Sequence, residues 1–283
     1  MVIINRRDKD GNEIKFFQDG YLVRTLAVFK NAIEKHNTST VIMIDGRSGM
    51  GKTTLANQIG VTLDENYGLH KIFYNPQDFL DGLQKSKKGD CFLFDEAMLI
   101  SSRSALSAIN KMIVQAMSMI RSKKIYIIFC VNSFFDLDRN LAISRADLLL
   151  HVYGQSLIDR GRFSAFFKGT DGQDRIKLLY LLGKKLYSYG KPKANYIGRF
   201  SKCFVVDEKE YEKQKQKGVN AFLGGKVGKK TVQAYDTRNN MIKAMFNDEN
   251  NPKTTKEIAE ISGLSVNTIQ QIVQKKFSLD ETA

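Results

Sequence analysis

The stretch Gly46-Arg-Ser-Gly-Met-Gly-Lys-Thr53 decides the prediction of the fold, because it fits the pattern G-x-x-x-x-G-K-[ST]. An apolar run, Val41-Ile-Met-Ile44, precedes it and predicts a strand, and the residues after it, Thr53 to Ile59, suit the first turns of a helix. A strand, a glycine loop and a helix are the context that a phosphate-binding loop requires. The three glycines let the backbone curve so that successive amides face phosphate oxygens. We therefore predict that this loop binds a nucleoside triphosphate.

The residue types of this loop predict separate tasks. The Lys52 ammonium would reach the β- and γ-phosphates, and the Thr53 hydroxyl would bind Mg²⁺. The other residues expected around the phosphates of ATP are Gly46, Arg47, Ser48, Gly49, Met50, Gly51 and Thr54. The alternative is an ordinary glycine-rich turn between a strand and a helix, which these flanking segments disfavour.

Two adjacent acids follow a second apolar run, Cys91-Phe-Leu-Phe-Asp95-Glu96. A buried strand that ends in acids suits an open α/β sheet, since ligands bind at the carboxyl ends of its strands. Asp95 would hold the Mg²⁺ shell, and Glu96 would polarise the water that attacks the γ-phosphate. A third apolar run ends in Asn132, which would bind that water or the γ-phosphate, or would instead cap the turn after the strand.

The composition is that of a globular protein, with 42% hydrophobic and 26% charged residues in a chain of 283. No apolar run approaches the roughly 20 residues of a membrane span, and no secretory leader is evident, so we expect no membrane span. The three cysteines lie far apart, without metal-ligand spacing, and two lie in strand-like runs where Cys serves as a small apolar residue. A reducing cytoplasm is the expected compartment.

Alternating strand and helix patterns predict an α/β fold with a mainly parallel sheet. We expect a hairpin at 2–17 and a helix at 21–36, then strands and helices in turn up to residue 152, among them a long helix at 102–120. After residue 153 four short runs predict an antiparallel extension of the same sheet: 162–168, 177–182, 185–189 and 203–206. The expected divisions are an N-terminal hairpin and helix (1–36), a nucleotide-binding core (37–217), a linker (218–230) and an all-α domain (231–283).

The motifs together resemble the P-loop ATPases that place an extra strand between the loop and the acids and use a catalytic glutamate. These are the AAA+, RecA-like and FtsK/HerA-like families, including viral relatives grouped with zonular occludens toxin. The resemblance covers about residues 40–210. It departs from AAA+ after Val152, where strands replace the expected helical lid, and this favours the FtsK/HerA-like branch. It implies an ATPase that uses ATP and Mg²⁺.

The same resemblance implies an arginine that enters a neighbouring subunit's site. The segment Leu141-Ala-Ile-Ser-Arg145 resembles the AAA+ segment that carries this residue, and Arg121 and Arg139 are competing candidates. An arginine in trans would stabilise charge on the transferred phosphoryl group. Because a monomer would then lack a complete site, we expect a homo-oligomer, in the form of a hexameric ring.

Residues 254–273 resemble a helix-turn-helix. Thr254 and Glu257 fit a capping box, Gly263 suits the turn, and Ser265 would cap the second helix. The residues expected to face DNA are Ser265, Val266, Asn267, Thr268, Gln270, Gln271 and Lys275. A three-helix protein-interaction module is the alternative.

The net charge of +14 is concentrated in residues 183–230, where 13 Lys and Arg face 4 Asp and Glu. A polyanionic partner, DNA, is the natural inference, and a solvated lysine-rich surface is the alternative. The sequence therefore predicts an ATP-driven DNA motor or remodelling ATPase of a virus or mobile element. A nucleotide-switched DNA-binding regulator, loader or transposition helper is the second hypothesis, and a small-molecule kinase is the third.

Overall fold

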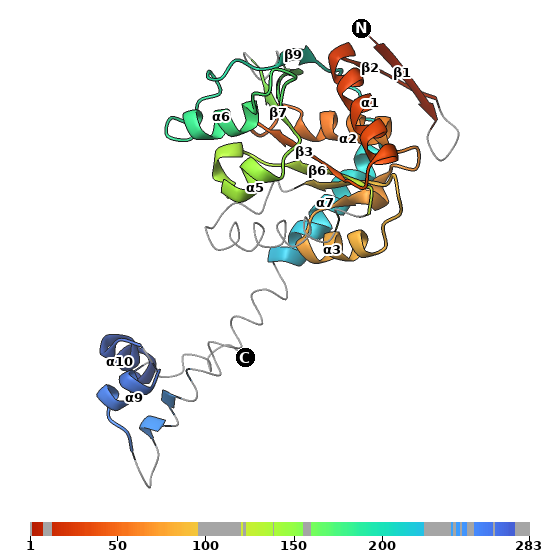
Figure 1. The fold of residues 1–283 in the computed structure, drawn as a ribbon. Coiled ribbons are helices and arrows are strands. Elements are labelled where there is room, and N and C mark those ends of the chain that lie inside the picture. The colour runs from red at the N-terminus through yellow and green to blue at the C-terminus, as the bar shows by residue number, and fades with distance from the viewer. Residues whose placement is uncertain are drawn as a thin grey trace. The chain divides into compact units, whose positions relative to one another are not determined.

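The structure is a computed structural model that describes residues 2–7, 13–95, 120, 123–137, 139–154, 160–223, 239, 242–243, 245–247, 252–262 and 264–274. The chain divides into two compact units, Met1–Val219 and Asn220–Ala283 (Figure 1). Each is treated by itself below. The predicted helix at 102–120 lies, apart from Ile120, outside the described residues.

A seven-stranded sheet forms the centre of the first unit, in the order β4-β5-β6-β3-β7-β8-β9. Its five strands from β4 to β7 are parallel, and β8 and β9 continue the sheet antiparallel. The strands are β3 (Thr40–Asp45), β4 (Ile72–Phe73), β5 (Cys91–Asp95), β6 (Tyr126–Cys130), β7 (Leu148–Tyr153), β8 (Arg162–Phe166) and β9 (Tyr196–Arg199). The predicted mixed α/β fold with a mainly parallel sheet is confirmed.

The order of the strands fixes where the two predicted nucleotide motifs lie. The strand β6 pairs with β3 on one side and with β5 on the other. The loop after β3 and the acid at the end of β5 are therefore separated by one strand, and all three strands end at the same edge of the sheet. This is the expected extra strand, and it brings Gly46, Asp95 and Asn132 to one edge.

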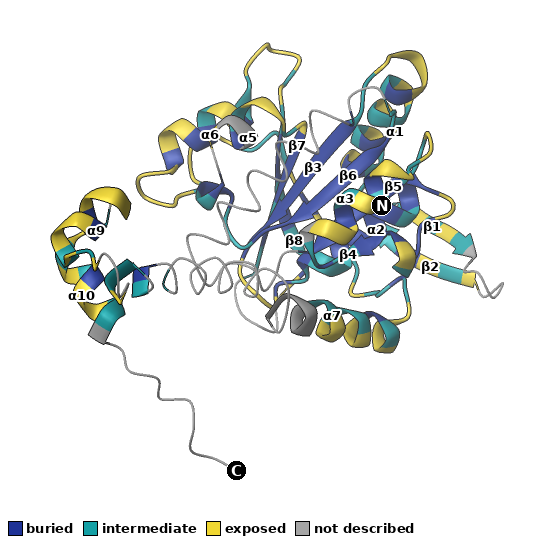
Figure 2. Cartoon of the chain, turned by 90° about the horizontal axis from the view of Figure 1, so that it is seen from below, coloured by how far each residue is buried: buried dark blue, intermediate teal, exposed yellow. Residues whose placement is uncertain are grey.

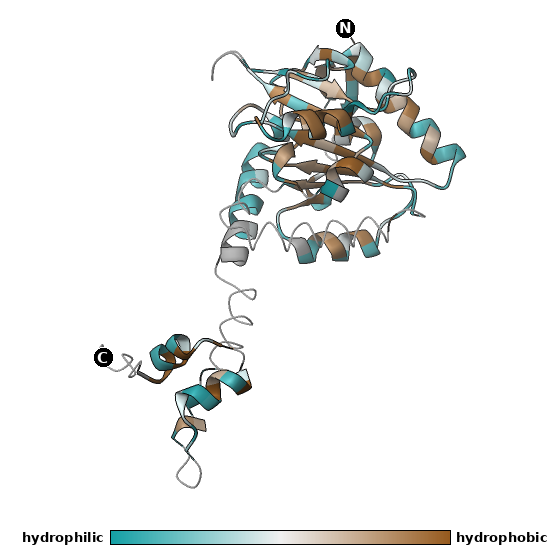
Figure 3. Cartoon of the chain, turned by 60° about the vertical axis from the view of Figure 1, so that its left-hand side comes forward, coloured by the Kyte–Doolittle hydropathy of each residue, from teal (hydrophilic) through white to brown (hydrophobic). Residues whose placement is uncertain are grey.

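Residues of the central strands are buried on both faces of the sheet (Figure 2), and these strands are hydrophobic (Figure 3). On one face, Ile42 and Ile44 of β3 join a core cluster with Leu22 and Leu26 of α1 and Ile59 of α2. On the other face the core is aromatic, since the Phe79 ring lies 5.2 Å from that of Phe94 and 5.7 Å from that of Phe129. Two buried faces explain why β3, β5 and β6 read as continuous apolar runs rather than alternating ones.

Helices and a hairpin surround this sheet. The helices and 3₁₀ turns are α1 (Gly20–Lys35), α2 (Lys52–Leu63), η1 (Leu69–Lys71), α3 (Pro76–Gln84), η2 (Phe134–Asp136), α5 (Arg139–Ser144), α6 (Arg175–Gly183) and α7 (Glu208–Leu223). The hairpin pairs β1 (Val2–Arg7) with β2 (Glu13–Gln18), as the sequence predicts. Because α7 continues to Leu223, residues 218–223 of the predicted linker are helical.

The antiparallel extension differs from its prediction. Residues 177–182 lie in the helix α6, which begins where the Asp174 side chain accepts a hydrogen bond from the Lys177 amide. Residues 185–189 and 203–206 belong to no strand, and β9 occupies Tyr196–Arg199 instead. Only the first of the four predicted runs, which contains β8, is correct. A short apolar run fits a helix and a strand equally well, and here the capping aspartate decides for the helix.

The second unit contains α9 (Thr255–Ser262) and α10 (Val266–Gln274). Its core is formed by Ile242, Ile258, Ala259 and Ile269. Thr254 and Glu257 cap α9 reciprocally: the Thr254 amide donates to Glu257 Oε2 at 2.8 Å, and the Glu257 amide donates to Thr254 Oγ1 at 3.3 Å. Ser265 caps α10 by accepting from the Thr268 amide at 3.2 Å.

None of the helices in the described part of the chain has the length and apolar character that crossing a bilayer requires.

Candidate nucleotide-binding site

The loop of residues 46–51 joins β3 to α2 in a conformation that only glycine adopts without strain at three positions. Gly46, Gly49 and Gly51 have φ angles of 135°, 79° and 94°. At Gly46 there is also no room for a side chain, since a Cβ would lie 2.1 Å from the carbonyl oxygen of Val152. The strand β7 thus packs directly against the backbone at the start of the loop. Arg47, Ser48 and Gly49 are exposed, whereas Met50 is buried and anchors the loop on the core.

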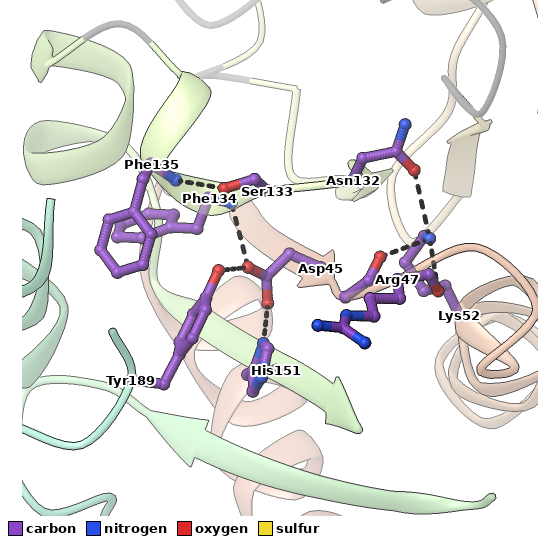
Figure 4. Close-up of polar contacts among 10 residues, drawn as sticks. Asp45, Arg47, Lys52, Asn132, Ser133, Phe134, Phe135, His151 and Tyr189 are labelled. Atoms are coloured by element: carbon purple, nitrogen blue, oxygen red, sulfur yellow. Dashed lines mark hydrogen bonds and ion pairs between the residues drawn. The ribbon is translucent and has the colours of Figure 1, made fainter. Parts of the chain in front are cut away.

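Lys52 is the first residue of α2, and its side chain folds back over the loop (Figure 4). Its ammonium donates to the carbonyls of Gly46 at 2.6 Å and Arg47 at 3.2 Å, and to Asn132 Oδ1 at 3.4 Å. Burial lowers the pKa of this lysine, while the charges of Asp95 and Asp45 act in the opposite direction. The structure therefore brings the predicted residues Lys52 and Asn132 together.

The Thr53 hydroxyl donates to Asp95 Oδ2 at 3.1 Å, so the two predicted metal-binding residues are in contact. Asp95 is 4% exposed, and its other oxygen, Oδ1, has no hydrogen-bond partner among the described residues. A buried carboxylate oxygen is costly without a partner. Hydroxyl and carboxylate oxygens are the ligands that Mg²⁺ prefers, so this pair fits the expected metal. Glu96, the predicted general base, lies outside the described residues.

Two residues of α7 that the sequence analysis missed also contact Asp95. The Tyr211 hydroxyl donates to Asp95 Oδ2, and the Lys215 ammonium lies 3.6 Å from the same oxygen. Burial, followed by the charge of Asp95, raises the pKa of Tyr211 well above its ordinary value, so its hydroxyl keeps its proton. The charged pattern of α7 predicts a helix, but it does not indicate which of its polar side chains face the protein.

A second buried carboxylate, Asp45 at the end of β3, was likewise not predicted as part of the site. Its Oδ1 lies 3.0 Å from His151 Nδ1, and its Oδ2 accepts from the Phe134 amide at 3.0 Å and from the Tyr189 hydroxyl. The rings of His151 and Tyr189 stack with centroids 3.5 Å apart. This Asp45 cluster (Asp45, Phe134, His151 and Tyr189; Figure 4) fixes the turn that follows Asn132, and so positions the Asn132 amide near Lys52.

The arginine that contacts the phosphate loop in the structure is not one of the three that the sequence predicted. Arg139, at the start of α5, and Arg145, directly after its end, are exposed, and within the described part of the chain neither contacts the loop. Arg121 lies outside the described residues. Arg160, in contrast, donates to the carbonyl of Gly49 at 2.7 Å and so reaches the tip of the phosphate loop within the same chain.

In the second unit, the exposed face of α10 carries most of the predicted DNA-facing residues. Ser265, Asn267, Gln270 and Gln271 are exposed, and Thr268 is half-buried against the cap. Val266 is half-buried and packs against the core of the unit, and its predicted contact with DNA stays a prediction. Lys275 lies outside the described residues.

A cavity of about 810 Å³ lies at the other end of α2 and includes no residue of the phosphate loop. Val61, Asp64 and Tyr67 line it from the side of α2, Arg6 and Ile14 from the hairpin, and Val205 to Asp207 from the segment before α7.

Comparisons with known proteins agree with the geometry of the loop. The model of a family described as "Novel STAND NTPase 3" matches residues 23–136, which supports a P-loop NTPase core. No curated protein sequence matches the chain.

Solved structures of other ATPases are similar at a low level. A RuvB Holliday junction branch migration motor from Thermotoga maritima has 13% identity, covers 90% of this chain and 85% of its own, and gives a TM-score of 0.34. The VirB11 ATPase of the Brucella suis type IV secretion system has 13% identity, covers 56% of each chain, and gives a TM-score of 0.31. The EccC type VII secretion ATPase of Thermomonospora curvata has 10% identity, covers 60% of this chain and 25% of its own, and gives a TM-score of 0.30. At these values the likeness carries no functional argument.

Proposed function

We propose that this chain is an ATP-hydrolysing, DNA-binding motor or remodelling ATPase that acts as a ring-shaped homo-oligomer. The observation that carries the ATPase part is the contact between Thr53 and Asp95 at 3.1 Å beside an Asp95 oxygen that no described residue satisfies. A loop that only binds phosphate does not need a buried carboxylate next to its hydroxyl. A site that holds Mg²⁺ with the nucleotide does.

The residues of the chain divide the work of this site. Backbone amides of residues 46–52 and the Lys52 ammonium would hold the phosphates, while Thr53 and Asp95 would hold Mg²⁺, which neutralises charge on the phosphates when bound. Asn132, positioned by the Asp45 cluster, would orient the attacking water, and Glu96 would accept its proton. Arg145 of a neighbouring subunit would stabilise the charge on the transferred group, with Arg121 and Arg139 as alternatives.

The DNA-binding part rests on charge and on the second unit. Of the 13 basic residues between 183 and 230, nine are exposed in the structure: Lys184, Lys185, Lys191, Lys193, Arg199, Lys202, Lys209, Lys213 and Lys217. Residues 231–283 would form the helix-turn-helix domain, with Asn267, Gln270 and Gln271 at base edges and Lys275 at a phosphate. The exposed side chains of Leu181, Leu182 and Leu186 offer an apolar surface of the kind that subunits bury.

A nucleotide-switched DNA-binding regulator is the second candidate, and one observation favours it. Tyr211 and Lys215, which contact Asp95, belong to the helix α7, whose last residues are the first of the second unit along the chain. Occupancy of the nucleotide site can therefore alter the segment that leads into the proposed DNA reader.

The test is ATP hydrolysis by the full chain with no DNA, with single-stranded DNA and with double-stranded DNA. We expect hydrolysis that DNA stimulates, and its loss in Lys52→Ala and Glu96→Gln. Strand displacement or translocation would favour the motor, whereas tight binding to one DNA site with slow turnover would favour the regulator. Normal hydrolysis by Glu96→Gln would contradict the assigned base, and the absence of any effect of DNA would contradict the motor.

The neighbour's arginine is tested by mixing variants. Glu96→Gln and Arg145→Ala proteins should each be inactive alone. Mixed in equal amounts, they should regain part of the activity, because some interfaces then combine an intact Glu96 with an intact Arg145. If Arg145→Ala alone stays active and Arg121→Ala does not, Arg121 is the residue that acts in trans.

A further inference from the structure

Lys215 lies on α7 one turn after Tyr211, and both side chains reach the carboxyl end of β5. Tyr211 is 1% exposed, and its ring packs against those of Phe204 and Tyr74 with centroids 5.2 and 5.7 Å away. The Lys215 ammonium lies 3.6 Å from Asp95 Oδ2 and 3.3 Å from the Tyr211 hydroxyl. The helix thus delivers a cation to the carboxylate that we expect to serve the metal.

The position of Lys215 is not shared by its neighbours on the helix. The side chain of Lys215 is 22% exposed, whereas that of Lys213 is 63% exposed and pairs with Glu210 at 3.4 Å on the surface. Holding a lysine against a buried carboxylate costs side-chain entropy and hydration, so an ordinary solvated lysine does not account for this geometry.

A divalent metal at Asp95 would weaken the ion pair between Lys215 and this carboxylate, because the carboxylate would then share its negative charge between two cations. Two cations within a few ångströms of each other repel unless anions lie between them. The charge of Lys215 also acts on Lys52: the pKa of Lys52 is lowered first by burial and further by the positive charge of Lys215. Phosphate oxygens are the anions that would let Lys52, Lys215 and the metal occupy one site together.

We propose that Lys215 is a phosphate-binding residue of the nucleotide site, which pairs with Asp95 before the nucleotide binds and moves to the phosphates when the metal takes the carboxylate. This inference rests on the proposed function, since it assumes that the loop binds a nucleoside triphosphate. Lys215 then competes for Asp95 with a metal that binds without nucleotide, and it strengthens the binding of a nucleotide that arrives with its metal. The site favours the metal–nucleotide complex over the free metal.

The experiment compares two affinities that this exchange moves in opposite directions. Mn²⁺ binding without nucleotide is measured by electron paramagnetic resonance, and binding of a fluorescent ATP analogue is measured at saturating Mg²⁺. In Lys215→Met we expect Mn²⁺ alone to bind about tenfold more tightly and the Mg²⁺-bound analogue about tenfold more weakly, the change that one charge-assisted contact produces. Lys213→Met is the matched control and Lys215→Arg should restore both values toward wild type.

A second variant covers the case in which Lys215→Met does not fold. Tyr211→Phe removes the other α7 donor from Asp95 and should also tighten Mn²⁺ binding, without removing a positive charge from the phosphates. If Lys215→Met matches Lys213→Met in both measurements, or if both affinities fall together, the inference is wrong while the nucleotide site stands. If the wild-type chain binds neither ATP nor its analogue, the proposed function itself fails.

Discussion

Asp45 and Asp95 end two strands of one sheet, separated only by β6, and both are almost completely buried. Every oxygen of Asp45 has a partner supplied by the fold: His151 on one side, and the Phe134 amide and Tyr189 on the other. Asp95 has three partners on one oxygen and none among the described residues on the other. The difference indicates that the first carboxylate holds the structure together, whereas the second is kept available for a ligand.

The largest expected effect comes from removing the charge that holds the Asp45 cluster. Asp45→Asn turns one of the two acceptor oxygens into a donor NH2 group and removes the charge, so at least one buried donor loses its acceptor, and such losses cost about 3–5 kcal/mol of unfolding free energy. Thermal and urea unfolding of the full chain would measure it. A cost below about 1 kcal/mol would mean that the cluster does not stabilise the fold and that the contrast with Asp95 is not real.

Asp95→Asn should show the reverse pattern. We expect binding of Mg²⁺ with ATP to weaken about a hundredfold, as for the loss of a charged ligand, while the unfolding free energy changes by less than about 1 kcal/mol because the substitution also removes a buried carboxylate with one unsatisfied oxygen. Isothermal calorimetry and urea unfolding on the same samples would give both numbers. A large loss of stability with unchanged binding would show that Asp95, like Asp45, stabilises the fold and does not bind the metal.

A smaller effect should follow when Asp45 loses one of its three partners. Tyr189→Phe removes a hydroxyl donor but leaves His151 and the Phe134 amide in place, so we expect a loss of about 1–1.5 kcal/mol in unfolding free energy. The control is Tyr187→Phe, whose hydroxyl contacts Asp136 at the surface. Equal losses in the two variants would show that burial of the Asp45 cluster adds nothing to the hydrogen bond.

The smallest effect concerns Glu257, a carboxylate that is satisfied but exposed. Hydrogen bonds from the Thr254 amide and hydroxyl lower the pKa of Glu257. The charge of Glu257 therefore stabilises the start of α9 fully at pH values above 4.5, the ordinary pKa of this carboxyl group. That contribution is lost as the pH falls below 4.5 and through the depressed pKa. Hydrogen exchange at the start of α9, measured from pH 7 down to pH 3, should show earlier opening at low pH, and Glu257→Gln should remove this dependence. A pH dependence that persists in Glu257→Gln would have another origin.

The nucleotide core could be predicted from sequence because its signals are local and of high contrast. Three glycines, a lysine and a threonine at fixed spacing, and apolar runs that end at Asp95 and just before Asn132, predict the strands that the structure brings to one edge of the sheet. The hairpin and the capping box of α9 were predictable for the same reason, since each depends on a few neighbouring residues.

The remaining parts of the site depend on contacts between distant segments. Tyr211 and Lys215 lie more than a hundred residues from Asp95, and nothing in the pattern of α7 separates Lys215 from Lys213. Asp45 could be predicted only as the end of a strand, because its partners come from three other segments. The helix α6 was mistaken for a strand because its short apolar run has no clear period.

The close approach of Gly46 to the Val152 carbonyl has a consequence for how the two halves of the sheet are joined. The strand β7 is the last parallel strand, and β8 and β9 continue from it. The part of the sheet formed by β7, β8 and β9 therefore contacts the first residue of the phosphate loop through backbone atoms and not through a side chain. A displacement of β7, whose preceding turn carries Arg145, would press directly on the first peptide of the loop. Because no side chain fits between the loop and β7, a movement of either one would be transmitted directly to the other.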